Sequence, residues 1–161
     1  MDALDQALTP YIGSDTTRLV GRLGLALILG LIIGLDREAR QKPAGLRSHM
    51  LVSLAAASFT IMTFAIVDAA SDIGDAVRAD PVRLMEAVVT GIAFLGAGTI
   101  IQSRGTVRGI TTGASLWLAG ALGVACGIGY FKLAIITTVL GLVVLFVIGW
   151  LASRFGPRDE D

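Results

Sequence analysis

The charged residues that lie inside or beside long apolar runs are those whose chemistry needs an explanation in this sequence. Glu86 and Arg83 are three residues apart near the start of one such run, so a helix would place both on one face. A charge at the centre of a lipid-embedded helix costs about 2.5–3.5 kcal/mol, and less toward the interface. We expect an ion pair between Glu86 and Arg83 near the interface. The alternative is a proton or cation site that opens to the acidic outer loops.

A second polar group closes another apolar run. Its members are Asp36, Arg37, Glu38, Arg47 and His49. Asp36 and Glu38 come at the C-terminal end of the run, where a helix dipole disfavours anions and nearby cations can compensate. Two interpretations stay open. The charges are solvated at the membrane surface, or Asp36, Arg47 and His49 hold the first loop against the link that contains Arg104 and Arg108.

Other chemical signatures are absent or weak. The sequence has no Walker loop, no G-x-S-x-G and no H-E-x-x-H motif, and its single histidine and single cysteine exclude multi-histidine and multi-cysteine metal sites. The outer acids Asp68, Asp72, Asp75 and Asp80 would attract Mg²⁺, but their spacing fits no defined metal-binding loop. We predict no enzymatic activity, no cofactor and no metal site.

The composition indicates the medium in which these residues act. Hydrophobic residues make up 54% of the 161 residues and charged residues 16%, against the roughly 25% charged residues of soluble domains. The charges cluster and leave long apolar runs between them. This pattern is typical of an integral membrane protein, and the net charge of zero offers no field for nucleic acid.

Five apolar runs are each long enough to cross a bilayer. We expect an all-α bundle with spans at about 17–35, 50–68, 82–101, 110–128 and 133–152, an N-terminal tail over 1–16 and a C-terminal tail over 153–161. Asp80-Pro81 fits the start of the third span, with proline at the first helical position. Thr111 and Thr112 can cap the fourth span or bond across helices, and capping is the expectation.

The cations predict the orientation of these spans. Eight lie on one side, namely Arg37, Arg40, Lys42, Arg47, Arg104, Arg108, Arg154 and Arg158. Five lie on the other, namely Arg18, Arg22, Arg78, Arg83 and Lys132. The positive-inside rule therefore places the N-terminus outside and the C-terminus in the cytoplasm, with Arg22 snorkelling to the outer interface.

Small residues predict where the helices touch. The first span repeats Ala26, Gly30 and Gly34 at intervals of four, and the third contains Gly91, Gly96 and Gly98. The fourth span repeats Thr111, Ser115, Ala119, Gly123 and Gly127. In lipid such residues let backbones approach closely. We expect the third and fourth spans to form the tightest contact and the bulky fifth span to face lipid.

These residues resemble the MgtC/SapB family of bacterial inner-membrane proteins. The resemblance rests on three stretches: GLIIGLDREARQKPAGLRSHMLV, DPVRLMEAVVTGIAFLGAGTII and GTVRGITTGASLWLAGALGVACGIGYFKLA. They place the family's acid–arginine pair at Asp36-Arg37, its loop motif at 44–49, its glycine motif at 91–98 and its link motif at 107–112. Ala93 stands where glycine is usual, Ala87 where glutamine is frequent, and Glu86 where a small residue is common.

The resemblance implies a five-span protein of the bacterial inner membrane with its N-terminus outside. Family members are linked to growth under magnesium limitation, and some act by binding other membrane proteins, including the F-type ATP synthase. The chain resembles a short form without the soluble C-terminal domain of the virulence members. We therefore predict a regulator that contacts membrane partners or itself. An ion carrier or channel using Glu86 and the Asp36 cluster is the alternative, and a subunit of a larger transporter is a third hypothesis.

Overall fold

The computed structural model describes residues 16–73, 80–103 and 106–148 together with Leu151 and Arg154. Its elements are α2 (Thr16–Ala39), α3 (Leu46–Ile73), α4 (Pro81–Gly98), β1 (Ile101–Ser103), β2 (Thr106–Arg108), α5 (Ile110–Ile128), α6 (Phe131–Val143) and the π-helical turn η1 (Val144–Ile148). The predicted N-terminal tail up to residue 15, Asp75, Arg78, Arg104 and most of the predicted C-terminal tail lie outside the described residues.

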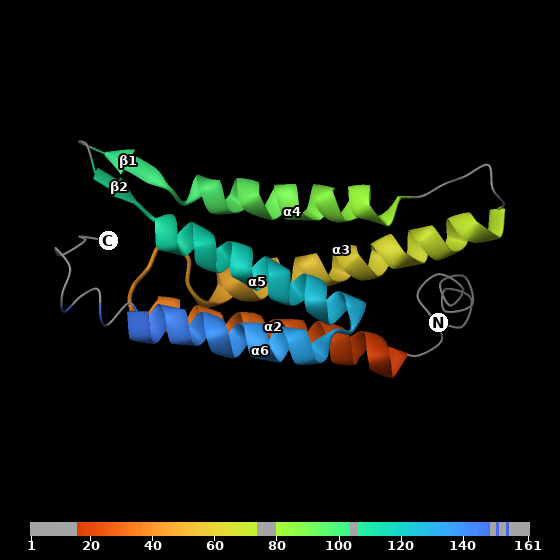
Figure 1. Cartoon of the computed structure of the whole chain (residues 1–161), viewed down its shortest axis with the longest axis horizontal. Coiled ribbons are helices and arrows are strands. Elements are labelled where there is room, and N and C mark those ends of the chain that lie inside the picture. Colours follow the sequence, from red (N-terminus) through yellow and green to blue (C-terminus); the bar gives the residue numbers. More distant parts are fainter. Residues whose placement is uncertain (1–15, 74–79, 104–105, 149–150, 152–153, 155–161) are drawn as a thin grey trace.

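The helices form an all-α bundle, as predicted. The helices α2, α3, α4 and α5 are each long and apolar enough to cross a membrane, and a shorter apolar helix spans Phe131–Val147. The chain is therefore a multi-pass membrane protein. The helix α5 lies at the centre, with α2, α3 and α6 on one side and α4 on the other (Figure 1). The α2–α3 loop and the strands lie at one end of the bundle, and the α5–α6 turn lies at the opposite end (Figure 1).

Local backbone signals set the helix ends. The Asp80 side chain accepts from the Val82 amide at 2.9 Å and Pro81 follows it, so α4 begins as predicted. The helix α5 ends where Gly129 adopts φ 94°, with the Tyr130 amide bonded to the Ala125 carbonyl and the Gly129 amide to the Cys126 carbonyl. This pattern is a Schellman motif, in which the left-handed residue is normally glycine.

Three predicted boundaries need correction. The helix α2 continues through Asp36 and Arg37 to Ala39, so the first loop is shorter than 36–49. It ends in a second Schellman motif, with Gln41 at φ 54°. The predicted link 102–109 contains an antiparallel pair of strands in which Ile101 lies opposite Arg108. Gly109, at φ 85°, precedes α5 with no side-chain cap, so Thr111 and Thr112 do not cap that helix.

The glycines divide into those that pack and those that do not. A Cβ on Gly30 would lie 2.7 Å from the His49 carbonyl oxygen, and one on Gly127 would lie 2.8 Å from that of Ala57, so both glycines bring their helix against α3. A Cβ on Gly113 would lie 2.8 Å from the carbonyl oxygen of Gly96, which joins α4 to α5 backbone to backbone. A Cβ on Gly91 or Gly98 would meet nothing within 4 Å. The predicted packing role of these last two glycines is therefore not seen within the chain.

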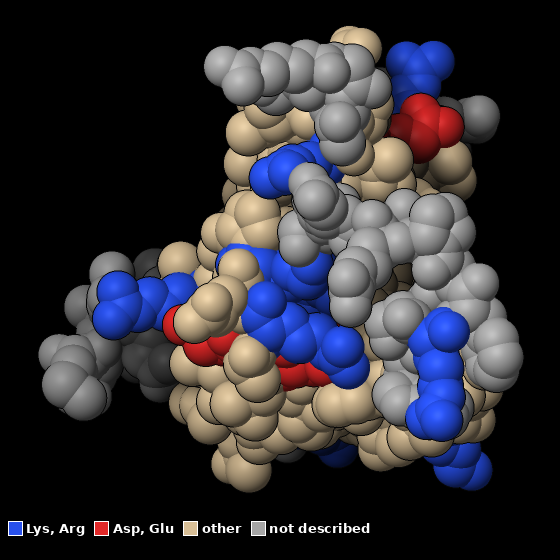
Figure 2. Space-filling model, turned by 90° about the vertical axis from the view of Figure 1, so that its left-hand side faces the viewer, with Lys and Arg blue, Asp and Glu red and all other residues tan. Residues whose placement is uncertain are grey.

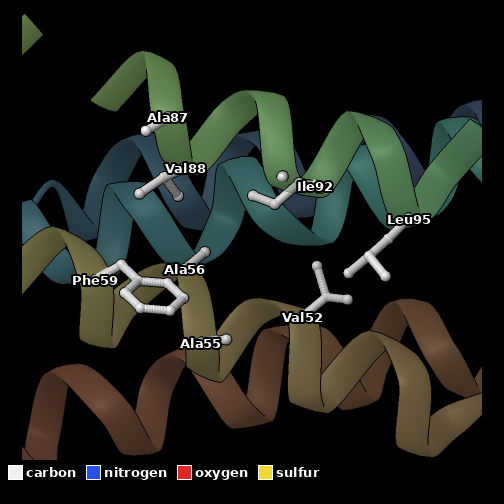
Figure 3. Close-up of a pocket in the computed structure, with 9 residues that line it drawn as sticks. Val52, Ala55, Ala56, Phe59, Ala87, Val88, Ile92 and Leu95 are labelled. Carbon is white, nitrogen blue, oxygen red and sulfur yellow. The ribbon is translucent and has the colours of Figure 1, made fainter. Parts of the chain in front are cut away.

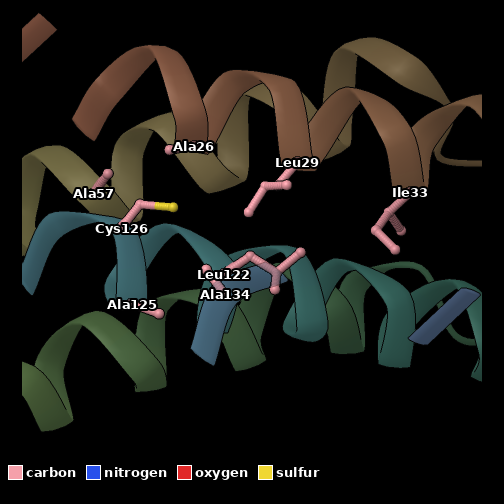
Figure 4. Close-up of a cluster of buried hydrophobic side chains, with 8 residues drawn as sticks. All are labelled: Ala26, Leu29, Ile33, Ala57, Leu122, Ala125, Cys126 and Ala134. Carbon is pink, nitrogen blue, oxygen red and sulfur yellow. The ribbon is translucent and has the colours of Figure 1, made fainter. Parts of the chain in front are cut away.

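The core lies where α2, α3, α5 and α6 meet (Figure 4). Its buried members are Ala26, Leu29, Ile33, Ala57, Leu122, Ala125, Cys126 and Ala134. Half of them are alanines, so the helix axes can approach closely and Leu122 fills the space between them. Ala119 and Ser115 of α5 are buried in the same interior. The outward face of α6 is bulky, as predicted, with Leu133, Ile136 and Leu140 all more than half exposed.

Candidate functional site

A charged cluster is buried at the C-terminal end of α2. Asp36 is 5% exposed and Arg37 is 3% exposed. Asp36 Oδ1 accepts a hydrogen bond from Arg40 Nε at 2.7 Å, and Arg37 Nη1 lies 3.8 Å from Asp36 Oδ2. The guanidinium of Arg40 also lies 5.4 Å from the centre of the Phe146 ring in η1. The two arginines offset both the burial of the Asp36 carboxylate and its unfavourable position at a helix C-terminus.

One oxygen of this carboxylate differs from the other. Asp36 Oδ2 is buried and has no hydrogen-bond partner among the described residues. A buried carboxylate oxygen without a hydrogen bond is costly, and native proteins keep few of them. Among the described residues, Asp36 Oδ2 and Arg37 Nε are the two buried side-chain atoms of the cluster without a hydrogen-bond partner.

Glu38, unlike Asp36, makes a hydrogen bond to the start of the next helix. Its Oε2 accepts a hydrogen bond from the Leu46 amide at 3.0 Å. Leu46 is the first residue of α3, so the carboxylate satisfies a free amide at a helix N-terminus, where negative charge is favourable. A Cβ on Gly45 would overlap the Glu38 carboxylate, which would have to move away to make room. Glu38 therefore connects the last turn of α2 to the first residue of α3.

His49 connects this end of the bundle to α5. It is fully buried, and its Nδ1 lies 2.7 Å from the Gly45 carbonyl oxygen while its Nε2 lies 3.0 Å from Ser115 Oγ. A carbonyl oxygen only accepts, so Nδ1 holds a proton and Nε2 faces the serine. Ser115 Oγ is also 2.9 Å from the Thr112 carbonyl oxygen, so its single proton has two acceptors when the imidazole is neutral.

Small residues make room for this bridge. A Cβ on Gly34 would lie 2.8 Å from the Cα of Leu46 and 3.2 Å from the Cβ of His49. Deeper in the bundle, Ser53 Oγ donates to the Ala26 carbonyl at 2.8 Å and ties α3 to α2. The glycine stripe of α2 therefore seats the start of α3, and with it His49.

The structure separates the predicted site residues into two groups. Asp36, Arg37, Glu38 and His49 line the junction of α2, α3 and α5, with Thr112 buried beside Ser115. Glu38 is exposed there, and so are the other predicted residues, namely Arg47, Arg83, Glu86, Arg108 and Thr111. Arg47 is not part of the ion pairs that the structure records for Asp36. Asp36 pairs with Arg37 and Arg40, and His49 bonds to Ser115, so the three residues Asp36, Arg47 and His49 do not form one cluster among the recorded contacts. Arg83 Nε lies 3.7 Å from Asp80 Oδ2, and the ion pair predicted with Glu86 is not recorded.

Two polar contacts were not predicted from the sequence. Ser115 was expected only to pack and Arg22 only to snorkel, whereas Arg40 is one of the nearby cations expected to compensate the charges of Asp36 and Glu38. Arg22 Nη1 donates to the Gly127 carbonyl at 3.0 Å, so it satisfies a carbonyl at the end of α5. The four-residue stripe did indicate that Ser115 faces inward, and only the fold identifies His49 as its partner. No group of three or more His, Cys, Asp or Glu side chains in the described part of the chain is placed to hold a metal ion.

Comparison with known proteins identifies the family. The model of the MgtC family matches residues 23–154. SapB of Bacillus subtilis is 33% identical over 93% of this chain and 63% of its own length. The putative magnesium transporter YhiD of Escherichia coli K12 is 39% identical over 89% of this chain and 66% of its own length. MgtC of Salmonella typhimurium is 38% identical over 80% of this chain and 52% of its own length.

The chain thus spans between half and two thirds of the length of these relatives. No solved structure matches it. The family model covers the buried Asp36-Arg37 pair, the His49–Ser115 bridge and all the helices from Leu23 onward. This chain belongs to the MgtC family.

Proposed function

We propose that the chain is a non-enzymatic regulator that contacts other membrane proteins during adaptation to magnesium limitation or envelope stress. The names of the relatives, one of which is a putative magnesium transporter, support the link to magnesium. The F-type ATP synthase is one candidate partner by family resemblance. A second copy of the chain is another.

One observation favours a regulator over a carrier: the central turns of the described helices have no charged side chain and no histidine. The charged residues of α2, α3, α4 and α6 lie near the helix ends, and α5 has none. Between those ends, Gly123 and Gly127 of α5 press against the backbone of α3. An ion crossing this interior would find backbone atoms already bonded within helices and no hydrated polar path.

The charge distribution supports an orientation. Lys and Arg side chains gather at the end of the bundle that contains the α2–α3 loop and the strands (Figure 2). The described cations there are Arg37, Arg40, Lys42, Arg47, Arg108 and Arg154, and the described acids are Asp36 and Glu38. By the positive-inside rule we assign this end to the cytoplasm of a bacterial inner membrane and the start of α2 to the outside.

Reconstitution separates the regulator from the carrier. Purified chain in liposomes with an internal Mg²⁺ or pH indicator should give flux no faster than protein-free liposomes. Crosslinking in native membranes should meanwhile capture a protein neighbour. Flux that rises with protein content and falls at least tenfold in Asp36→Asn or Glu86→Gln would overturn the regulator proposal.

The carrier is the second candidate because of Asp36 Oδ2, the buried carboxylate oxygen without a hydrogen-bond partner. A carrier would use this oxygen for a proton or for Mg²⁺ at the cytoplasmic end. Obligate co-purification with one stoichiometric membrane protein would instead indicate a subunit of a larger transporter.

A further inference from the structure

The helix α4 is held to the bundle along one narrow face. Of its described side chains only Ile92 and Gly96 are buried. Ile92 packs on Gly120, and Gly96 packs on Gly113, so both contacts are with α5. Toward α3, α4 leaves an apolar groove of about 340 Å³ between Val52, Ala56 and Phe59 on one side and Val88, Ile92 and Leu95 on the other (Figure 3). Its lining residues are all apolar, so the groove suits a lipid tail.

The face of α4 that points away from α5 has a different composition. We define the outer face of α4 as the exposed residues Arg83, Glu86, Ala87, Thr90, Phe94 and Ala97, of which Ala87 also lines the groove toward α3. Arg83, Ala87, Thr90, Phe94 and Ala97 follow one another at intervals of four, three, four and three. That spacing is the repeat by which helices pack along a shared seam. Phe94, 78% exposed, is the one large apolar side chain on it.

This face is unlike one that meets lipid. The outward side of α6 shows what lipid selects here, because Leu133, Ile136 and Leu140 are branched aliphatic residues. The outer face of α4 instead has alanines, a threonine and two opposite charges. Small residues suit close helix approach. Arg83 and Glu86 lie in the first two turns of α4, where a charge costs less than at the centre of a membrane span. Among the described residues no ion pair involves Glu86, and the Arg83 side chain is 85% exposed beside Asp80.

We propose that the outer face of α4 binds the same face of a second copy of this chain, with the two α4 helices parallel around a two-fold axis. Copies inserted in one membrane share an orientation, so their α4 helices run in the same direction. A two-fold contact requires a self-complementary surface. Arg83 and Glu86 supply it, because they lie one turn apart and the axis brings Glu86 of each copy beside Arg83 of the other. Phe94 then packs over the small residues of the opposite helix. This inference does not depend on the proposed function.

Disulfide crosslinking in native membranes tests the contact. The native Cys126 is fully buried and should not crosslink, so the unchanged chain is the negative control. Thr90→Cys and Ala97→Cys place a thiol on the seam, while Val89→Cys on the flank of α4 and Leu140→Cys on α6 are exposed controls. Mild oxidation should link the seam variants into dimers about tenfold more than the controls. Equal linking at all four positions, or none, would overturn the proposal and leave lipid as the occupant.

A charge exchange identifies the occupant. Arg83→Glu makes the outer face wholly acidic, and Glu86→Arg makes it wholly basic. Each variant with Thr90→Cys should form about fivefold fewer dimers with itself, because like charges then face each other. The two variants carrying different tags should link to each other as well as the parent does. A variant that had failed to fold could not recover in the mixture. Loss in both without recovery in the mixture would contradict the two-fold contact and indicate a different protein on this face.

Discussion

The two sides of α5 make contacts of different kinds. On the side of α2 and α3, glycines of α5 lie in contact with the backbone of α3, and the His49–Ser115 hydrogen bond joins these two helices. Toward α4 it meets two buried residues, Ile92 and Gly96. Within their apolar stretches 61% of α5 residues are buried, against 12% in α4. The difference teaches that α2, α3 and α5 form the stable unit, while α4, which like α6 has only two buried residues among those described, leaves most of its surface exposed.

The largest expected change in stability comes from adding a methyl group to a glycine of α5, and a matched variant adds one to a glycine of α4. A Cβ in Gly123→Ala would collide with the Ser53 carbonyl oxygen and lie 2.9 Å from the Ala56 Cβ. Because both are held by α3, we expect a loss of about 2–3 kcal/mol in the free energy of unfolding. The matched change Gly91→Ala adds its methyl where nothing lies within 4 Å and should not destabilise the chain.

Unfolding of both variants in mixed detergent micelles, followed by circular dichroism, measures the two values. A loss of similar size at both positions would contradict the division, since it would mean that α4 is as tightly enclosed at Gly91 as α5 is at Gly123.

The sequence predicts some helix boundaries correctly and others incorrectly. The spacing of apolar runs predicts five helices, and Asp80-Pro81 marks a helix start, because these signals act within a few residues. Asp36, Arg37 and Glu38 were read as the end of a span because three charges in a row normally meet water. They continue the helix because Arg40 lies one turn ahead of Asp36 and because Glu38 satisfies α3.

The site itself was predicted only in part. His49 was expected in a polar cluster, but its partner Ser115 lies 66 positions away and belongs to a stripe read as packing. Gly91, Gly96 and Gly98 look alike in the sequence, and only the direction of α4 decides that Gly96 alone meets α5. The strands Ile101–Ser103 and Thr106–Arg108 have three residues each, too few for an alternating pattern to show.

An intermediate effect on stability is expected from removing the His49–Ser115 hydrogen bond between α3 and α5. Ser115→Ala leaves His49 Nε2 buried without its hydroxyl partner, which should cost about 1–2 kcal/mol of unfolding free energy. Ser58→Ala is the matched control, because its hydroxyl only bonds the Leu54 carbonyl of its own helix at 2.9 Å. We expect less than about 0.5 kcal/mol there. The same micelle assay measures both, and equal losses would mean that the bridge adds nothing to the α3–α5 contact.

The smallest effect should come from the open side of α5. Gly96→Ala would place its Cβ 3.1 Å from the Gly113 carbonyl oxygen, tighter than usual by a few tenths of an ångström. Since most of the other described side chains of α4 are exposed, the helix can shift outward, and we expect a loss of no more than about 1 kcal/mol. Gly98→Ala, with nothing within 4 Å, is the control and should not destabilise. The shift should appear as faster proteolysis or higher hydrogen exchange in α4 with α2, α3 and α5 unchanged. If Gly96→Ala instead loosened the whole bundle as strongly as Gly123→Ala, α4 would belong to the stable unit, and its outer face would no longer differ in kind from that of α6.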